Sequence, residues 1–289
     1  MKLISHYRDN DLLRKSFIEL AREIFGINFS SWHEWGYWSN RYIPYSYADG
    51  DKIVANVSVN KLDFIVEGYR YRALQIGTVM THPDYRSKGL SASLMSQIQE
   101  EHKDHYDFMY LFANDSVLGF YPKFGFERVE EFLYTAKTAS QTRDVLLRKL
   151  DISNPEDLQL VEKMVYERIP VSKVFATANS GGITMYHVLN IFTDHLYYSA
   201  QDDAIVIFSK DDGKVQLFDV VSRAPVNIER ILAAIADGAT NKIVFHYTPD
   251  YEELKYSLSP FKRDGALFVK TNGGLPFPRQ AKHPVTSEA

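Results

Sequence analysis

The chain contains no cysteine, and its 289 residues carry a net charge of only −4. The absence of cysteine excludes disulfides, thiolate metal sites and a cysteine nucleophile. The weak negative charge argues against a protein that binds nucleic acid through the phosphate backbone. No apolar run approaches the length of a membrane span, and residues 1–9 are too charged for a signal peptide. We therefore expect a cytoplasmic protein with neither a membrane nor a nucleic acid as its partner.

The nine histidines show no metal-ligand spacing. We expect no metal site. A chain of this length favours two domains, each large enough to bury its own core.

Residues 74–91 are the most informative stretch. Alternating apolar residues at 74–79 predict a strand, and apolar residues at helical spacing from Leu90 to Ile98 predict a helix. The turn between them consists of Arg86, Ser87, Lys88, Gly89, Leu90 and Ser91. A helix N-terminus carries free backbone N–H groups, and Gly89 lets the backbone approach a ligand closely. The turn therefore predicts a site for a phosphorylated ligand.

A second informative segment follows at residues 108–126. The apolar run 108–113 predicts a short strand, after which come Asn114 and the sequence Gly-Phe-Tyr-Pro-Lys-Phe-Gly-Phe at 119–126. In this order, the two segments resemble motifs A and B of the GCN5-related N-acetyltransferases (GNAT). The family loop Arg/Gln-x-x-Gly-x-Gly/Ala stands here as Arg86-x-x-Gly89-x-Ser91. Ser91 departs from the pattern but is still small.

This resemblance implies an α+β fold around a mixed sheet, with acetyl-CoA as cosubstrate and an amine as acceptor. Backbone groups of Val79, Met80 and Thr81 would contact the pantetheine arm and polarise the thioester carbonyl, and Asn114 would also contact that arm. The turn 86–91 would hold the pyrophosphate. Tyr121 would be the general acid that protonates the leaving thiolate. The alternative is that Tyr121 only packs a helix onto the sheet.

The acceptor side is indicated by residues 31–47, which contain all three tryptophans and four tyrosines. Aromatic walls bind a cationic amine by cation–π attraction, or a sugar or ring by stacking. The same rings would alternatively join the two domains or form a contact in a homo-oligomer. We assign no general base. The candidate acceptor residues are Trp32, Glu34, Trp35, Tyr37, Trp38 and Tyr45.

The pattern predicts that the two halves share one order of elements. In the first half we expect a helix at 12–24, a strand at 52–66 and a final strand pair at 128–135 and 144–150. The second half reads as helix 155–166, strands 196–199, 204–209 and 214–221, helix 227–236, strand 242–247, helix 251–258 and strand 266–270. The turn 222–227 lacks the phosphate loop, and Pro225 removes a backbone donor there.

We therefore expect tandem GNAT domains, the second of them degenerate and unable to bind coenzyme A. The predicted boundaries are residues 1–145 for the catalytic domain, 146–272 for the degenerate domain and 273–289 for a poorly ordered tail.

The first half resembles acetyltransferases of the enhanced-intracellular-survival type. Because this chain is too short for their sterol-carrier-like domain, their use of the chain terminus in the active site is not carried over to Ala289. A degenerate second domain that closes one end of the cleft favours a small-molecule amine. The alternatives are a non-catalytic coenzyme-A-binding regulatory module and a two-domain interaction scaffold.

Overall fold

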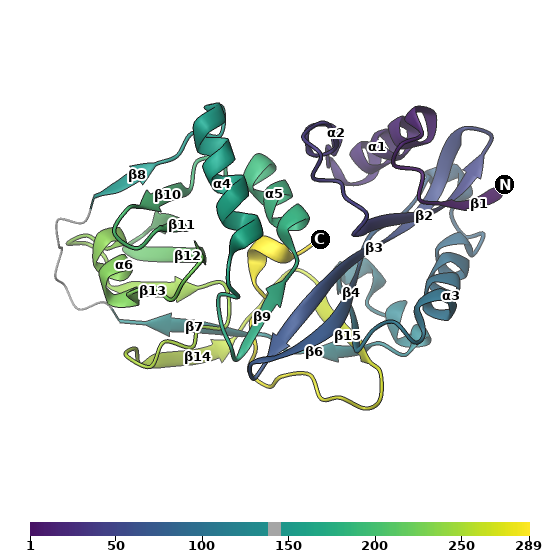
Figure 1. Ribbon diagram of the computed structural model, residues 1–289. Helices are drawn as coiled ribbons and strands as arrows, with labels where there is room; N and C mark the ends of the chain where they lie inside the picture. The colour runs from purple at the N-terminus through teal and green to yellow at the C-terminus, as the bar shows by residue number, and fades with distance from the viewer. Residues whose placement is uncertain (138–145) are drawn as a thin grey trace.

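The computed structural model describes residues 1–137 and 146–289. Figure 1 shows two lobes side by side, each built on a β-sheet, with the C-terminal residues between them. Both sheets mix parallel and antiparallel strand pairs. The predicted mixed α+β architecture with two related halves is confirmed.

The first sheet has the strand order β1-β2-β3-β4-β5-β15-β6, and β9 also pairs with β3. Its β4–β5 pair is parallel, and α3 connects these two strands. The strands are β1 (Lys2–Ser5), β2 (Tyr42–Asp49), β3 (Lys52–Val66), β4 (Tyr69–Thr81), β5 (Phe108–Ala113), β6 (Glu127–Val129), β9 (Phe175–Ala178) and β15 (Ala266–Thr271).

The second sheet has the order β14-β7-β13-β12-β11-β10-β8. Its β12–β13 pair is parallel and is connected by α6, so it repeats the β4–α3–β5 arrangement of the first sheet. The strands are β7 (Phe132–Ala136), β8 (Leu147–Lys149), β10 (Leu196–Ser199), β11 (Ala204–Asp211), β12 (Lys214–Ser222), β13 (Lys242–Phe245) and β14 (Tyr256–Pro260).

Helix positions follow local capping signals. Helix α1 begins where the Asn10 side chain accepts a hydrogen bond from the Leu13 N–H, and it ends at Gly26 in the left-handed region. Helix α4 has Asn154 as its N-cap and Pro155 in its first turn. The helices are α1 (Asp11–Phe25), α2 (Ser30–Glu34), α3 (Leu90–His102), α4 (Pro155–Glu167), α5 (Gly181–Asn190) and α6 (Ile228–Ile235), with short 3-10 helices η1 (Pro83–Tyr85), η2 (Asp115–Val117), η3 (Tyr121–Phe124) and η4 (Val285–Ser287).

One apolar core runs through both lobes. Phe17 and Trp32 from the first lobe share a buried cluster with Val161, Val188 and Ile205 from the second. A separate core lies under α3 on the other face of the first sheet, and another lies under α6 in the second lobe. The shared core fixes the two lobes against each other.

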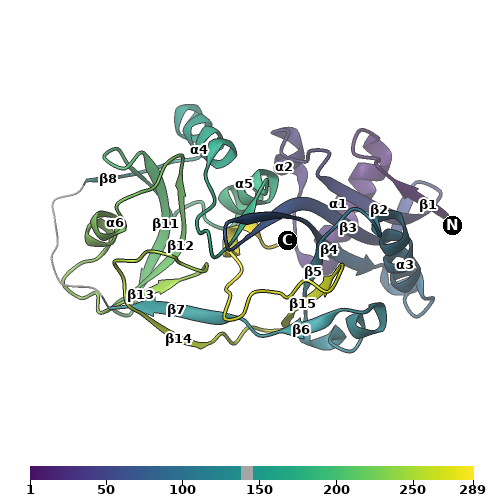
Figure 2. The same ribbon diagram turned by 60° about the horizontal axis from the view of Figure 1, so that its bottom comes forward.

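The two sheets exchange strands, which the predicted boundaries did not anticipate. Only two residues separate β6 in the first sheet from β7 in the second, so the single strand predicted at 128–135 is in fact two. Farther on, the chain returns from β14 to β15, which lies between β5 and β6 of the first sheet. Figure 2 shows β7 and β6 following one another along one side of both lobes. The strand predicted at 266–270 exists, but it belongs to the first sheet.

Three other expectations need correction or limits. The helix predicted at 251–258 is wrong, because β14 begins at Tyr256 and pairs with β7, and its alternating polar residues fit a strand. Strand β9 and helix α5 were not anticipated. The strand predicted at 144–150 is seen as β8, while its first two residues lie outside the described part of the chain.

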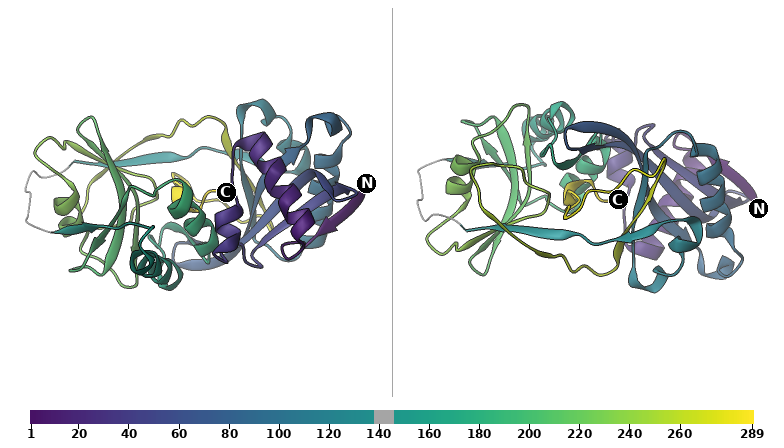
Figure 3. Two further views of the ribbon diagram at one scale, coloured as in Figure 1. Left: turned by 90° about the horizontal axis from the view of Figure 1, so that it is seen from above. Right: turned by 90° about the horizontal axis from the view of Figure 1, so that it is seen from below.

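The prediction of a poorly ordered tail is also wrong. Residues 281–287 are almost entirely buried, and Lys282, His283 and Ser287 are among the least exposed polar residues of the described chain. The two views in Figure 3 both place the C-terminal end between the lobes. The tail's polar and proline-rich composition resembles that of a flexible segment, but its polar groups have hydrogen-bond partners inside the protein.

No helix in the described residues combines the length and apolar character needed to cross a bilayer. Within the same residues, no three side chains of the metal-ligating types gather as they would around an ion.

Candidate active site

The site begins where β4 and β5 part. Their parallel ladder ends at the Ile76–Leu111 pair, although β4 continues to Thr81 and β5 to Ala113. Past this point the two strands diverge, and a cavity of about 360 Å³ lies there. Gly77, Thr78 and Val79 line it from β4, and Asn114 lines it just past the end of β5. Because the strands diverge, β4 has backbone N–H and C=O groups that would bond to β5 if the ladder continued.

A β-bulge shapes the β4 side of this opening. The register with β3 shifts between Asn56 and Ser58, and Thr78 opposite has φ of +49°. This left-handed conformation is strained for a β-branched residue and persists only where the surroundings hold it.

Buried side chains supply that support. The Asn56 amide donates to the Thr78 carbonyl at 2.8 Å and to the Ser58 hydroxyl at 2.8 Å. The Tyr42 hydroxyl lies 2.8 Å from the Ser58 hydroxyl and 3.0 Å from Thr78 Oγ1. The bulge is therefore fixed before any ligand arrives.

The predicted phosphate turn lies at the start of α3. Gly89 is the helix N-cap with φ of +73°, and no side chain caps the first N–H groups. A Cβ added at Gly89 would project into open space. Residues 86–89 are exposed, and Ser91 Oγ lies 2.9 Å from Thr81 Oγ1, which ties the turn to the end of β4. These residues fit a pyrophosphate group, because uncovered N–H groups, cationic side chains and free space meet here.

The other residues predicted to bind the cofactor differ in which of their groups are free to contact it. Met80 and Leu90 bury their side chains in the apolar cores, so those side chains are not free to contact a ligand. The Lys88 ammonium donates to the Asp84 carbonyl at 3.0 Å and lies 4.6 Å from the centre of the Tyr85 ring.

Tyr121 lies at the start of η3, buried against Phe120, Phe126 and Phe268. Burial raises the pKa of its phenol to about 12, so the hydroxyl keeps its proton throughout the physiological range. Within the described residues this hydroxyl has no hydrogen-bond partner, and Tyr121 is not among the residues that line the cavity. Its role as general acid stays a prediction.

Of the six candidate acceptor residues, only Trp32 lines the cavity. Its indole Nε1 donates to the Gly182 carbonyl of α5 at 2.6 Å, so it also joins the lobes. The others lie elsewhere: Tyr37 and Trp38 are buried behind it, Glu34 and Trp35 are exposed, and Tyr45 bonds to Glu101 and His102 on α3.

The second lobe supplies the opposite wall of the cavity, which the sequence pattern did not indicate. Ile183, Tyr186 and His187 of α5 line it, followed by Ile191. The first lobe adds the apolar residues Phe25, Ile27 and Phe29, with Tyr42 and Asn60 from β2 and β3. The clustering of aromatic residues at 31–47 was the signal in the sequence that pointed to this region.

The last residues of the sequence also reach the cavity. Glu288 and Ala289 line it, and a Cβ added at Gly77 would lie 3.4 Å from the carbonyl carbon of Ala289. The Gln75 side-chain amide faces the Ser287 carbonyl at 3.1 Å and the Ala289 N–H at 2.9 Å. Ala289, to which the use of the chain terminus was not carried over from the resemblance, therefore lies at the site.

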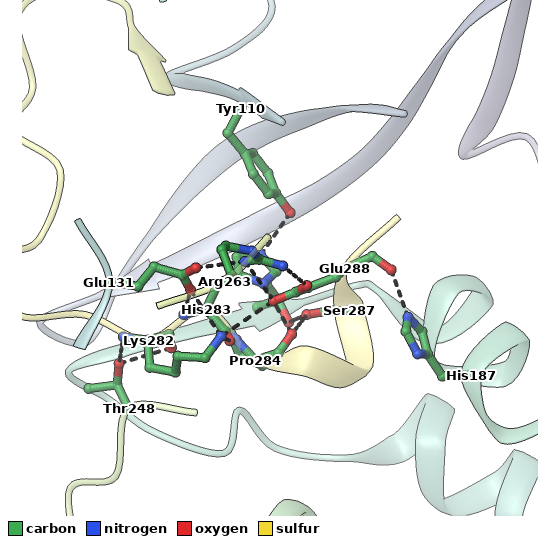
Figure 4. Close-up of polar contacts among 11 residues, drawn as sticks. Tyr110, Glu131, His187, Thr248, Arg263, Lys282, His283, Pro284, Ser287 and Glu288 are labelled. Carbon is green, nitrogen blue, oxygen red and sulfur yellow. Dashed lines mark hydrogen bonds and ion pairs between the residues drawn. The ribbon is translucent and has the colours of Figure 1, made fainter. Parts of the chain in front are cut away.

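A buried charge network holds this segment in place (Figure 4). Glu131 accepts hydrogen bonds from Arg263 at 2.6 Å, from the Lys282 ammonium at 3.0 Å and from the His283 N–H at 3.1 Å. The same two cations contact the Glu288 carboxylate, Arg263 at 2.5 Å and Lys282 at 3.4 Å. Because the Glu131 and Lys282 side chains are nearly sealed from water, each of these two charges depends on its partners.

At the end of the parallel strand pair in the second sheet, the C-terminal segment bonds to the strands. The β12–β13 ladder ends at Leu217–Phe245, where the Val285 N–H donates to the His246 carbonyl at 3.1 Å. Thr286 Oγ1 donates to Asp219 Oδ2 at 2.5 Å. Val285 and Thr286 thus bond to the second sheet just past the end of its parallel strand pair.

Comparison with known proteins shows which family has similar features. Residues 8–129 match the family model described as an acetyltransferase (GNAT) domain. Over this region the chain is similar to a GNAT domain. The matched residues include the diverging strands, the turn 86–91 and Tyr121, and the match ends in β6. No curated protein matches the sequence.

Solved structures extend the GNAT likeness to both lobes. A probable N-acyltransferase from Enterococcus faecalis is 13% identical with a TM-score of 0.62, covering 94% of this chain and 72% of that one. Eis1 from Mycobacterium abscessus is 12% identical with a TM-score of 0.58, covering 94% and 74%. A GCN5-related N-acetyltransferase from Kribbella flavida is 14% identical with a TM-score of 0.55, covering 93% and 71%. At these identities the likeness is one of fold.

Proposed function

We propose that this GNAT protein transfers acetyl from acetyl-CoA to the amino group of a small molecule. The main support for the proposal is that three features of the site lie next to one another. The uncapped N-terminus of α3, the divergence of β4 from β5 and the aromatic cavity follow one another along a single strand. A phosphorylated carrier lying on β4 would present its far end to the cavity.

The residues for holding acetyl-CoA are those of the turn and of β4. Arg86, Lys88 and the first N–H groups of α3 would bind the pyrophosphate, and Asn114 with the β4 backbone would bind the pantetheine arm. When bound, acetyl-CoA supplies an activated thioester carbonyl. Exposed β4 N–H groups would polarise that carbonyl, since the bulge at Thr78 is already fixed by buried hydrogen bonds.

Tyr121 would hold the proton that the departing thiolate needs. Its buried phenol stays neutral in the physiological range, which a general acid must do before transfer. The enclosure of the cavity by α5 favours a small acceptor over a protein, because the second lobe covers the side opposite β4.

A thiol-release assay tests the function. The chain has no cysteine, so a thiol-reactive chromophore will report only coenzyme A. We expect release from acetyl-CoA that depends on an added primary amine, with the acetylated amine detected by mass spectrometry. Acetyl-CoA binding without release for any amine in a broad panel would favour the regulatory-module alternative.

A further inference from the structure

We infer that the Thr78 hydroxyl donates a hydrogen bond to the carbonyl oxygen of the acyl group that is transferred. The inference rests on the proposed function, and it adds a side-chain donor to the backbone N–H groups of β4. Its evidence is a buried chain of hydrogen bonds that ends at Thr78, on the wall of the cavity.

A continuous chain of side-chain hydrogen bonds crosses strands β2, β3 and β4. Its members, in order, are Tyr7, Ser46, Asn56, Ser58, Tyr42 and Thr78, and bonded atoms lie 2.6–3.0 Å apart. Ser46, Asn56 and Ser58 are fully buried, whereas Thr78 keeps part of its surface accessible. Because polar groups sealed from water bond to one another, the direction of each bond can be worked out.

The Asn56 amide sets the direction of the chain. Its Nδ2 donates to the Thr78 backbone carbonyl, which can only accept, so the orientation of the amide is fixed. Asn56 Oδ1 accepts from Ser46, and Nδ2 also donates to Ser58 Oγ. Ser58 then donates its own hydrogen to the Tyr42 hydroxyl. The Tyr42 hydrogen is left for Thr78 Oγ1, which lies 3.0 Å away.

Thr78 Oγ1 therefore accepts from Tyr42 and has its own hydrogen left over. Tyr42 is the one hydrogen-bond partner of Thr78 Oγ1 among the described residues, and both residues line the cavity. Burial raises the pKa of the Tyr42 phenol, so it keeps donating throughout the physiological range. Hydrogen bonds aligned in one direction polarise one another. The chain thus makes Thr78 a preorganised O–H donor toward the cavity.

In an acyl-transfer site, the productive partner for such a donor is the acyl oxygen. A neutral amine attacks through its lone pair, and a hydrogen bond to that lone pair would hinder the attack. The carbonyl oxygen gains negative charge as the amine adds, and a preorganised donor stabilises this charge. Thr78 lies at the bulge of β4, the strand that we propose holds the acyl carrier. The hydroxyl keeps its proton throughout, because it acts only as a hydrogen-bond donor.

Removal of the hydroxyl tests the inference by two independent measurements. Thr78→Val keeps a β-branched side chain of similar size but has no donor. By calorimetry, we expect the preference for acetyl-CoA over coenzyme A to fall by about 2- to 10-fold, the effect of one hydrogen bond, with coenzyme A affinity itself unchanged. By steady-state kinetics, we expect kcat to fall by about 10²-fold, with KM for the amine unchanged. Thr78→Ser should restore both quantities.

Two further variants separate the donor from a structural role. Thr135→Val is the matched control, because Thr135 lies on β7, bonds to the Ser257 carbonyl and does not line the cavity. It should keep both wild-type values. Tyr42→Phe removes the bond to Thr78 but leaves the Thr78 donor, so its kcat should fall by less than about tenfold. Thr78→Ala replaces the valine variant if the latter does not fold.

Four outcomes would contradict the account. An unchanged affinity ratio and kcat in Thr78→Val would overturn the inference while leaving acetyl transfer intact. A raised KM for the amine as the only effect would also overturn it, since the donor would then serve an oxygen of the acceptor. Equal losses in Thr78→Val and Tyr42→Phe, with weakened coenzyme A binding in both, would reduce Thr78 to support of the bulge. Failure of the wild type to bind acetyl-CoA would instead refute the proposed function itself.

Discussion

At the scale of single residues, Tyr121 carries the chemical prediction. Removing its hydroxyl in Tyr121→Phe keeps the ring that packs against Phe120 and Phe268. We expect kcat to fall by about 10²- to 10⁴-fold, as for loss of a general acid, with acetyl-CoA affinity changed by less than about threefold. Steady-state kinetics and calorimetry measure the two quantities separately.

Tyr106→Phe is the control for that variant. Tyr106 is buried in the same apolar core, and burial raises the pKa of its phenol as well. It should keep wild-type kcat. A Tyr121→Phe variant with full kcat would reduce Tyr121 to the packing role that the sequence left open.

Residue-scale predictions from the sequence succeeded where local rules act. The turn at Gly89 and the strand containing Val79 follow from short-range pattern and turn chemistry. The acceptor side was harder, because Tyr37, Trp38 and Tyr45 have the same composition as Trp32 but face other neighbours. Which aromatic residue faces a cavity is decided by tertiary packing, which residue type alone does not reveal.

At the scale of elements, the buried charge network around Glu131 holds the C-terminal segment in place. Glu131→Gln would remove a buried negative charge and leave Lys282 with Glu288 alone, at 3.4 Å. We expect the free energy of unfolding to fall by about 3 kcal/mol, because breaking a buried ion network leaves an uncompensated charge. Denaturant unfolding measures the change.

The neighbouring Glu130→Gln is the control, since Glu130 is exposed. It should alter stability by less than about 0.5 kcal/mol. Equal stabilities of the two variants would mean that the network does not anchor residues 282–288.

Helices with a clear spacing of apolar residues were predicted well. Strands whose place depends on pairing with a strand far away in the sequence were not. The segments that became α1, α4 and α6 have capping residues and apolar spacing that point to helices. By contrast, β15 pairs with β5, from which it is separated by some 150 residues. No local pattern records which sheet a strand will join, and the same holds for the buried tail.

At the scale of the whole molecule, the two lobes form one interlocked unit. The chain crosses between sheets at β6–β7 and again at β14–β15, and the shared core spans both lobes. The second lobe supplies α5 to the cavity, while Val285 and Thr286 bond to the end of its own parallel strand pair. The account therefore requires one coenzyme A site per chain.

Calorimetric titration with acetyl-CoA tests this central claim most directly. We expect the wild type to bind one acetyl-CoA per chain with micromolar affinity, and Gly89→Trp to lose binding because its side chain would fill the open space at the start of α3. Gly68→Trp is the matched control, since Gly68 has a similar φ of +79°, equally open surroundings and a place in the distant β3–β4 turn. Its binding should equal that of the wild type. Absence of binding by the folded wild type, or two sites per chain, would contradict the account.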